Sequence, residues 1–222
     1  MSGADLRGLL FSFVYVLAVL LLLDMFRRYL NVSVEVTRKV VHIAVGMWVF
    51  PTLLLFDHWT WAIVPPIVFT GLNALSLRYR LFEAIETQER SLGTVYFPFS
   101  FALLLALFWP IGRPEIAAGG LMAMTWGDAM AAVVGRGYGQ RRFVVWGQEK
   151  SWMGSLSCFS WTFLAVTMTL RFVGGYAPLQ ALLHAVLAGL VAAVVEAFTP
   201  LKMDNLSVPI LTAAALYLLA VL

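Results

Sequence analysis

The sequence has little charge and almost no cysteine. Only 12% of its 222 residues are Asp, Glu, Lys or Arg, whereas 61% are hydrophobic and the mean hydropathy is +0.86. A soluble domain needs a charged surface, so this composition excludes one and indicates a polytopic membrane protein. The single cysteine, Cys158, lies in a hydrophobic run, which excludes a disulfide framework and leaves the redox compartment open.

Long polar segments are also missing, so no soluble catalytic domain fits, and any chemistry falls to membrane helices and their loops. The apolar runs do not alternate with period two, which indicates helices rather than a barrel. Several are shorter than a full crossing and are expected to extend into their polar flanks. The expected spans are 8–23, 40–56, 59–77, 95–109, 116–134, 152–172, 178–198 and 208–222. We predict an all-α fold with about eight transmembrane helices, seven if the last run lies flat, in one domain over residues 1–222.

The basic residues predict an orientation. Twelve of the fifteen follow the first, third, fifth and seventh spans, namely Arg27, Arg28, Arg38, Lys39, Arg78, Arg80, Arg90, Arg136, Arg141, Arg142, Lys150 and Lys202. Basic residues favour the cytosolic side, so both termini are expected on the outer side. The net charge of +3 is therefore a topology signal and does not indicate a nucleic-acid partner.

Asp128 is the most informative residue. It lies inside the apolar run 116–134, six residues from its end, which places it about 9 Å below the predicted cytosolic surface. A carboxylate at that depth is costly, and such residues usually line an ion, substrate or catalytic cavity. The alternative is a carboxylate that reaches the interface or pairs with an arginine.

A basic group opens the second span. Arg38, Lys39 and His42 share one helical face at spacings of three and four residues. An ordinary cluster that contacts lipid phosphates explains Arg38 and Lys39 equally well. That alternative explains His42 less well, because His42 lies a turn deeper.

A segment of small and hydroxyl-bearing residues precedes the fourth span. Arg90 and Ser91 are followed by Gly93 and Thr94, which are suited to capping the helix amides and letting a phosphate approach the backbone. Alone, this is a weak signal.

Two further segments favour an anion. The glycines at 135, 137 and 139 surround Arg136, and small residues there also suit close helix packing. Lys150 and Ser151 then precede the sixth span, where Ser151 is a candidate N-cap and Lys150 adds a cation near the helix start. Neither segment has the spacing of a Walker A loop or of a dinucleotide-binding turn.

Carboxylates follow near the end of the chain. Glu196 closes the seventh span, and Asp204 and Asn205 follow Pro200. Together with Asp128 they offer the hard oxygen ligands that Mg²⁺ prefers when it is shared with phosphates. One cysteine and three scattered histidines do not provide a zinc site.

The ordered set of motifs resembles the family of CTP-dependent lipid-alcohol kinases, which includes phytol kinase, dolichol kinase and the CTP-dependent diacylglycerol kinase. The resemblance covers residues 38–209 and rests on Arg38, Lys39, His42, Arg90, Ser91, Gly93, Thr94, Gly127, Asp128, Gly135, Gly139, Lys150, Ser151, Gly154, Glu196, Asp204 and Asn205. The chain departs from the pattern at Met153, where a glutamate is expected. The Gly-Asp and Lys-Ser elements are also similar to those of phosphatidate cytidylyltransferases.

The resemblance implies transfer of the terminal phosphoryl group of CTP to a long-chain alcohol, with Mg²⁺ as cofactor. Phytol or a polyprenol is the favoured substrate, and diacylglycerol also fits. Asp128, Glu196 and Asp204 would hold the metal, and the basic side chains would neutralise phosphates. The base remains open between Asp128 and His42. A CDP-lipid synthase and a proton- or cation-coupled transporter are the alternatives, although the clustering of polar residues on one side disfavours a relay.

Overall fold

The computed structural model describes residues 1–79, 92–200 and 203–221. Its elements are the helices α1 (Gly3–Leu30), α2 (Val34–Gly46), α3 (Val49–Leu55), α4 (Trp59–Ala62), α5 (Val64–Tyr79), α6 (Gly93–Phe108) and α7 (Pro114–Met122), the π-helix η1 (Ala123–Asp128), helix α8 (Ala129–Tyr138), the strands β1 (Arg142–Val145) and β2 (Gln148–Ser151), and helices α9 (Trp152–Phe172), α10 (Pro178–Phe198) and α11 (Asp204–Val221).

Within these ranges, seven helical segments are long and apolar enough to cross a membrane. Three of these segments consist of shorter consecutive elements. α2 and α3 form one segment, α4 and α5 form another, and α7, η1 and α8 form the third. The apolar α6 is shorter than the other seven and supplies the remaining predicted span. The polytopic, mainly helical fold is thus confirmed.

Several helices extend beyond the apolar runs into their polar flanks, as expected, and N-caps mark the start of two of them. Ser2 and Asp5 form a capping box that begins α1 at Gly3, and Ser33 caps α2 at Val34. α11 begins at Asp204 instead of residue 208. The basic side chains Arg38 and Lys39 therefore lie inside α2, where they face the protein.

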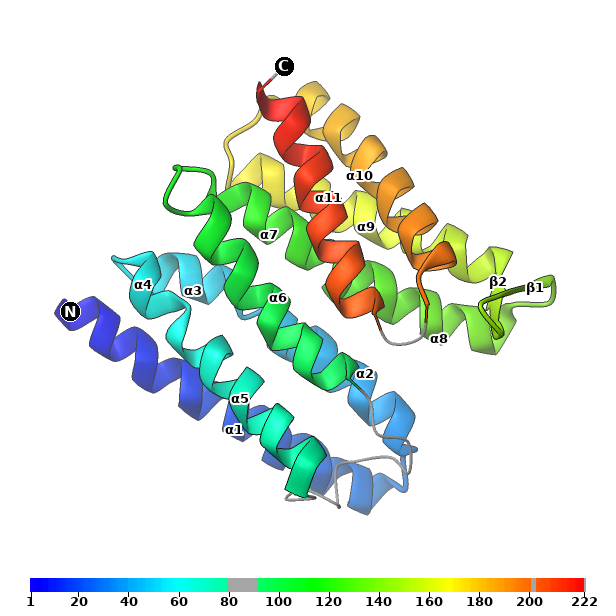
Figure 1. Ribbon diagram of the computed structural model, residues 1–222, viewed down its shortest axis with the longest axis horizontal. Coiled ribbons are helices and arrows are strands. Elements are labelled where there is room, and N and C mark those ends of the chain that lie inside the picture. The colour runs from blue at the N-terminus through cyan, green and yellow to red at the C-terminus, as the bar shows by residue number, and fades with distance from the viewer. Residues whose placement is uncertain (80–91, 201–202, 222) are drawn as a thin grey trace.

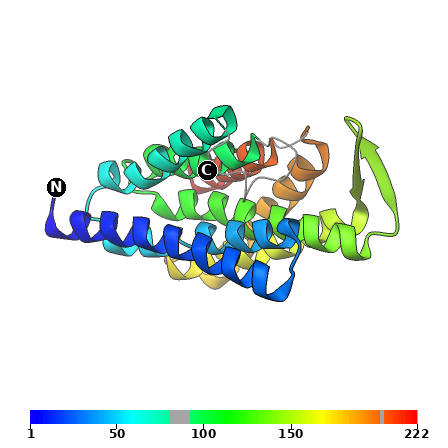
Figure 2. The same cartoon turned by 90° about the horizontal axis from the view of Figure 1, so that it is seen from below.

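The helices form a bundle with α7, η1 and α8 through its middle (Figures 1 and 2). In Figure 1, α9, α10 and α11 pack on one side of them, and α2 and α6, followed by α1 and α5, lie on the other. The span Pro114–Tyr138 is the most enclosed, with 78% of its apolar window buried. Asp128 therefore belongs to the helix that is least exposed to lipid.

A short β-hairpin is the one addition to the helices among the described residues. β1 and β2 pair antiparallel, and the turn residues Trp146 and Gly147 have φ of 51° and 75°. Positive φ at both central residues is the pattern of a type I′ turn, which suits Gly147. The hairpin carries the chain from α8 back to α9 and places Lys150 and Ser151 at the start of α9.

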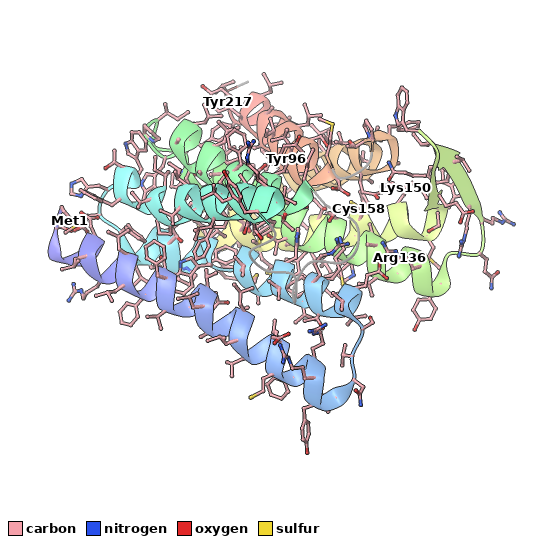
Figure 3. The ribbon with its side chains drawn as sticks, turned by 60° about the horizontal axis from the view of Figure 1, so that its bottom comes forward. Met1, Tyr96, Arg136, Lys150, Cys158 and Tyr217 are labelled. Atoms are coloured by element: carbon pink, nitrogen blue, oxygen red, sulfur yellow. The ribbon has the colours of Figure 1, made fainter. Side chains whose placement is uncertain are left out.

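Both termini lie at one end of the bundle, and the α1–α2 and α8–α9 connections lie at the other (Figure 1). Figure 3 shows Met1 far from Arg136 and Lys150. The arrangement agrees with an even number of crossings and gathers the basic connections at one end. Which end faces the cytosol stays a prediction.

Candidate active site

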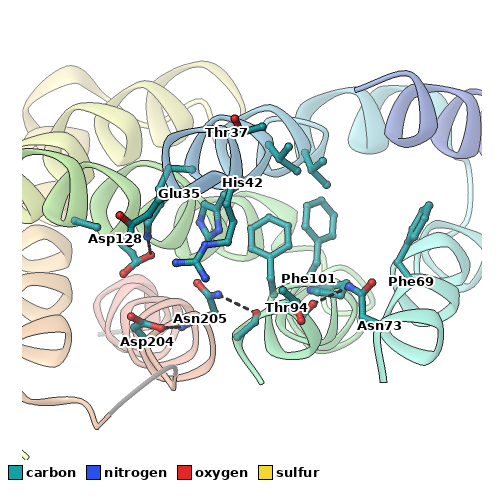
Figure 4. A pocket seen from close by; sticks show the side chains of 18 of the residues that line it. Glu35, Thr37, His42, Phe69, Asn73, Thr94, Phe101, Asp128, Asp204 and Asn205 are labelled. Carbon is teal, nitrogen blue, oxygen red and sulfur yellow. Dashed lines mark hydrogen bonds and ion pairs between the residues drawn. The ribbon is translucent and has the colours of Figure 1, made fainter. Parts of the chain in front are cut away.

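One cavity of about 800 Å³ collects most of the candidate residues (Figure 4). Those that line it are Arg38, Lys39, His42, Gly93, Thr94, Asp128, Gly135, Lys150, Ser151, Gly154, Glu196, Asp204 and Asn205. Gly139 is not part of the lining, and Arg90 and Ser91 lie outside the described residues. Side chains that are far apart in the sequence therefore meet at one site.

Asp128 is 3% exposed and ends the π-helix η1. Its Oδ2 accepts a hydrogen bond from Lys39 Nζ of α2 at 2.9 Å. The buried carboxylate thus has a lysine partner, not the arginine that the alternative considered. A π-helical turn inside an α-helix is rare and frequently marks a functional site.

Glycines let neighbouring helices approach η1 closely. A Cβ at Gly127 would lie 2.2 Å from Thr162 Oγ1 of α9, and one at Gly46 would lie 2.1 Å from Thr125 Oγ1. Both distances are far below van der Waals contact. Gly127 and Gly46 are thus required for the packing of α9 and α2 around Asp128.

His42 has a defined tautomer in its neutral form. Its Nε2 lies 2.9 Å from the carbonyl oxygen of Met124 in η1, and a carbonyl only accepts, so Nε2 carries the proton. The imidazole also contacts the Phe97 ring, with centroids 4.4 Å apart. Neutral His42, which lines the cavity, therefore has an unprotonated Nδ1.

Lys150 forms a second ion pair, with Glu196 of α10, and also donates to the Glu196 carbonyl oxygen at 3.0 Å. Partial burial acts to lower the pKa of Lys150, but the carboxylates of Glu196, Asp204 and Asp128 outweigh it and raise the pKa above the ordinary lysine value. The ammonium group therefore stays charged at neutral pH. Lys39 and Lys150 each neutralise a nearly buried carboxylate.

The start of α11 supplies the third carboxylate and an amide. Asp204 Oδ1 accepts from the Asn205 backbone N–H at 2.9 Å. Asn205 Nδ2 donates to the Gly93 carbonyl at 2.9 Å, which assigns the amide orientation. Asn205 Oδ1 is left buried without a hydrogen-bond partner. An unpaired buried oxygen beside carboxylates is a candidate metal or substrate ligand.

Among the described residues, no three His, Cys, Asp or Glu side chains converge closely enough to form a metal site. Asp128, Glu196 and Asp204 line the same cavity, but lysines hold two of them. The predicted magnesium site is thus not assembled from protein ligands alone.

The glycines at the end of α8 have a packing role. A Cβ at Gly139 would lie 2.2 Å from the Gly135 carbonyl oxygen, and one at Gly154 would lie 3.0 Å from the Ala131 carbonyl oxygen. Ser151 Oγ donates to the Gly135 carbonyl at 3.4 Å. These contacts join α8 to α9, while the predicted contact with phosphates remains untested.

The N-cap at Ser151 is confirmed, since its Oγ accepts from Gly154 N–H at 3.0 Å. Trp152 N–H donates to the Arg141 carbonyl at 3.2 Å. Two of the first amides of α9 are thus already used, so an anion here would depend mainly on Lys150. Met153 is 45% exposed and does not line the cavity, so the departure at this position removes no cavity carboxylate.

The other half of the cavity is apolar, and no sequence pattern indicated it. Figure 4 shows Phe69 and Phe101 away from Asp128 and Asp204. The apolar lining comes from α1, α2, α5 and α6 and includes Val16, Leu17, Leu20, Val41, Val45, Phe69, Leu72, Phe97 and Phe101. Such residues are ordinary in membrane helices, so only the structure separates them from lipid-facing ones.

Comparisons with known proteins identify the family of the chain. The chain is 34% identical over 198 residues to phytol kinase of Synechocystis sp., covering 88% of this chain and 84% of that protein. It is 32% identical over 208 residues to probable phytol kinase 2, chloroplastic, of Glycine max (87% and 68%), and 29% identical over 208 residues to phytol kinase 1, chloroplastic, of Arabidopsis thaliana (83% and 66%). No family model and no solved structure matches.

Fold and relatives together define a polytopic membrane kinase that acts on a lipid alcohol. The chain belongs to the family of lipid-alcohol kinases that contains the phytol kinases, as the motifs indicated.

Proposed function

We propose that the protein transfers the terminal phosphoryl group of CTP to the hydroxyl of a long-chain isoprenoid alcohol, with phytol as the first candidate. The observation that carries the proposal is a single cavity with a charged half and an apolar half. A lipid alcohol has the same division, and a nucleotide needs the charged part. The names of the relatives favour phytol, and the resemblance of the motifs favours CTP.

The charged half suits phosphates. Lys39 and Lys150 already hold their ammonium groups in the cavity through Asp128 and Glu196. Phosphoryl transfer depends mainly on positioning and charge neutralisation. When the nucleotide binds, both lysines exchange a carboxylate for phosphate oxygens, and Arg38, which also lines the cavity, adds a further cation.

The carboxylates of the charged half suit Mg²⁺. Asp128 and Glu196, which the lysines release, line the cavity together with Asp204 and Asn205, and Asn205 Oδ1 lacks a partner. Mg²⁺ is commonly bound by one or two carboxylates plus phosphates, which agrees with a site that protein ligands do not complete. When bound, the ion would supply charge neutralisation between the phosphates.

In the reaction, the alcohol oxygen bonds to the terminal phosphorus while the bond from that phosphorus to the bridging oxygen breaks, and CDP leaves. The alcohol proton needs an acceptor. We assign it to His42, because neutral His42 lines the cavity and has an unprotonated Nδ1, whereas Asp128 would be occupied by Mg²⁺ once Lys39 has moved to the phosphates. Asp128 would then serve to hold the metal.

The test uses purified protein in nanodiscs with CTP, ATP, GTP or UTP, labelled separately in the terminal and the α-phosphate. Phytol, a polyprenol, diacylglycerol and phosphatidate are offered in turn. The expected products are CDP and a lipid phosphate that carries the terminal label. Release of pyrophosphate with phosphatidate would instead identify a cytidylyltransferase, and a uniform lack of turnover would reject the kinase.

A further inference from the structure

We propose that Trp48 forms the floor of the apolar half and limits the length of the alcohol chain that the enzyme accepts. The inference rests on the proposed function, since it assigns the apolar half to the alcohol tail. It follows from the depth of the cavity, the fixed position of the indole ring and the residues that close the space behind it.

The two helices α1 and α5 give the same depth for the cavity. The cavity follows α1 from Asp24 to Ser12 and α5 from Leu77 to Pro65, and each stretch rises about 18 Å. The shallow ends carry polar groups, whereas the deep ends meet Trp48 and Thr52. The cavity is therefore a long chamber that reaches well into the membrane-spanning part, with space for an extended alkyl chain.

Trp48 is held in place on both sides. Its Nε1–H donates to Ser12 Oγ at 2.9 Å, and its ring stacks on Tyr15 with centroids 4.3 Å apart and planes 19° apart. The Tyr15 hydroxyl in turn donates to the Ala44 carbonyl at 2.8 Å. The ring lies at the break between α2 and α3, and these contacts restrain it from moving aside for a longer chain.

The polar atoms at the deep end are all satisfied by the protein. Ser12 Oγ donates to the Gly8 carbonyl at 2.7 Å, and Thr52 Oγ1 donates to the Trp48 carbonyl at 2.8 Å. Thr52 and Ala62 also line this end and are 2% and 1% exposed. These groups at the floor therefore already have partners within the protein, which suits the end of a hydrocarbon tail and not a second polar group.

The experiment measures kcat/KM for farnesol, geranylgeraniol, phytol and solanesol, the longest of the four. The wild type is expected to discriminate against solanesol. Trp48→Ala removes the floor and should raise the solanesol-to-phytol ratio about tenfold or more. Ala62→Leu adds bulk to the same end and should move the preference in the opposite direction, toward farnesol.

Trp161→Ala is the matched control, because Trp161 stacks on Trp126 and does not line the cavity. It should lower activity, if at all, by the same factor for every alcohol. Trp48→Phe keeps an aromatic ring and tests whether bulk is sufficient. A length profile that stays unchanged in both Trp48→Ala and Ala62→Leu, with the wild type active, would overturn the inference. Absence of alcohol phosphorylation by the wild type would instead reject the proposed function.

Discussion

At the scale of single residues, the ion pairs of the cavity change what a mutation is expected to do. Asp128 has Lys39 as partner, so removal of its charge leaves a mostly buried ammonium uncompensated. Loss of one member of a buried pair is destabilising. The buried carboxylate alone suggested the opposite, since an unpaired charge would be a stability cost.

Asp128→Asn is therefore expected to abolish turnover and to lower stability by up to about 3 kcal/mol. Asparagine preserves the shape but offers neither a full charge to a metal nor one to Lys39. Phosphorylation assays and thermal unfolding in detergent measure the two effects. Adding Lys39→Met should recover stability but not activity. Near-normal turnover in folded Asp128→Asn would remove this residue from the site.

Lys150→Ala is expected to weaken CTP binding about ten- to a hundredfold, because it loses a charge-assisted contact of roughly 1.5 to 3 kcal/mol. The same change leaves the Glu196 carboxylate without its ion-pair partner. The double variant Lys150→Ala, Glu196→Gln is therefore the proper control. Lys150→Arg should restore CTP affinity only in part, because a planar guanidinium group replaces a compact ammonium group.

Equilibrium binding of CTP to these variants distinguishes two roles of Lys150, a contact with phosphate and a topology signal. If Lys150 is only a topology signal, arginine should substitute for it fully. The raised pKa of Lys150 adds a pH criterion. The contribution of the ammonium is complete below the ordinary lysine pKa and is lost only as the pH rises through the raised value. CTP affinity that declines near neutral pH would therefore have another cause.

His42→Gln is expected to remove the acidic limb of the kcat/KM profile while CTP affinity changes little. Glutamine keeps a donor for the Met124 carbonyl but cannot accept a proton. The kcat/KM for CTP, measured across pH at saturating alcohol, checks this assignment. An acidic limb that persists in His42→Gln and disappears in Asp128→Asn would transfer the role to Asp128.

At the scale of elements, the contact between η1 and α9 fixes the position of Asp128. Gly127→Ala is expected to destabilise the protein strongly and to impair activity, because the new Cβ would lie 2.2 Å from Thr162 Oγ1. Thr162 Oγ1 has no hydrogen-bond partner, so Thr162→Ala removes the clash at small cost. The double variant should recover unfolding temperature and activity together. Failure of Thr162→Ala to rescue would show that the glycine serves the π-helical backbone itself.

The elements also show what the sequence could predict. The spans follow from apolar runs, and Ser151 follows from the preference for hydroxyls at an N-cap. The π-helical turn does not follow, because it has no periodicity of its own and its close contacts, of Gly127 with Thr162 and of Thr125 with Gly46, join distant segments. The hairpin had a signal in Trp146 and Gly147, but its short strands lie between two strongly apolar segments.

At the scale of the whole molecule, the candidate residues were predictable as a group and their partners were not. Asp128 and Glu196 are conspicuous as carboxylates in or beside apolar runs, but the lysines that neutralise them come from α2 and β2. The apolar half could not be found from the sequence, since leucines that face the cavity resemble those that face lipid. Pairing and enclosure depend on tertiary contacts between distant segments.

The arrangement of the termini leads to the last prediction, which concerns the side of the membrane. Both termini lie at one end of the bundle, and most basic residues lie at the other, so the cavity mouth is expected to face the cytosol. Gln140 and Val32 are exposed in the connections after α8 and α1, and Ala177 and Ile111 are exposed in the connections after α9 and α6. Cysteines at Gln140 and Val32 should escape an impermeant maleimide in intact cells and react after permeabilisation, whereas those at Ala177 and Ile111 should react in both. Cys158 is buried, so the unmodified chain gives the background. Labelling of Gln140→Cys from outside would invert the topology and place the cavity on the opposite side from the cytosolic nucleotide.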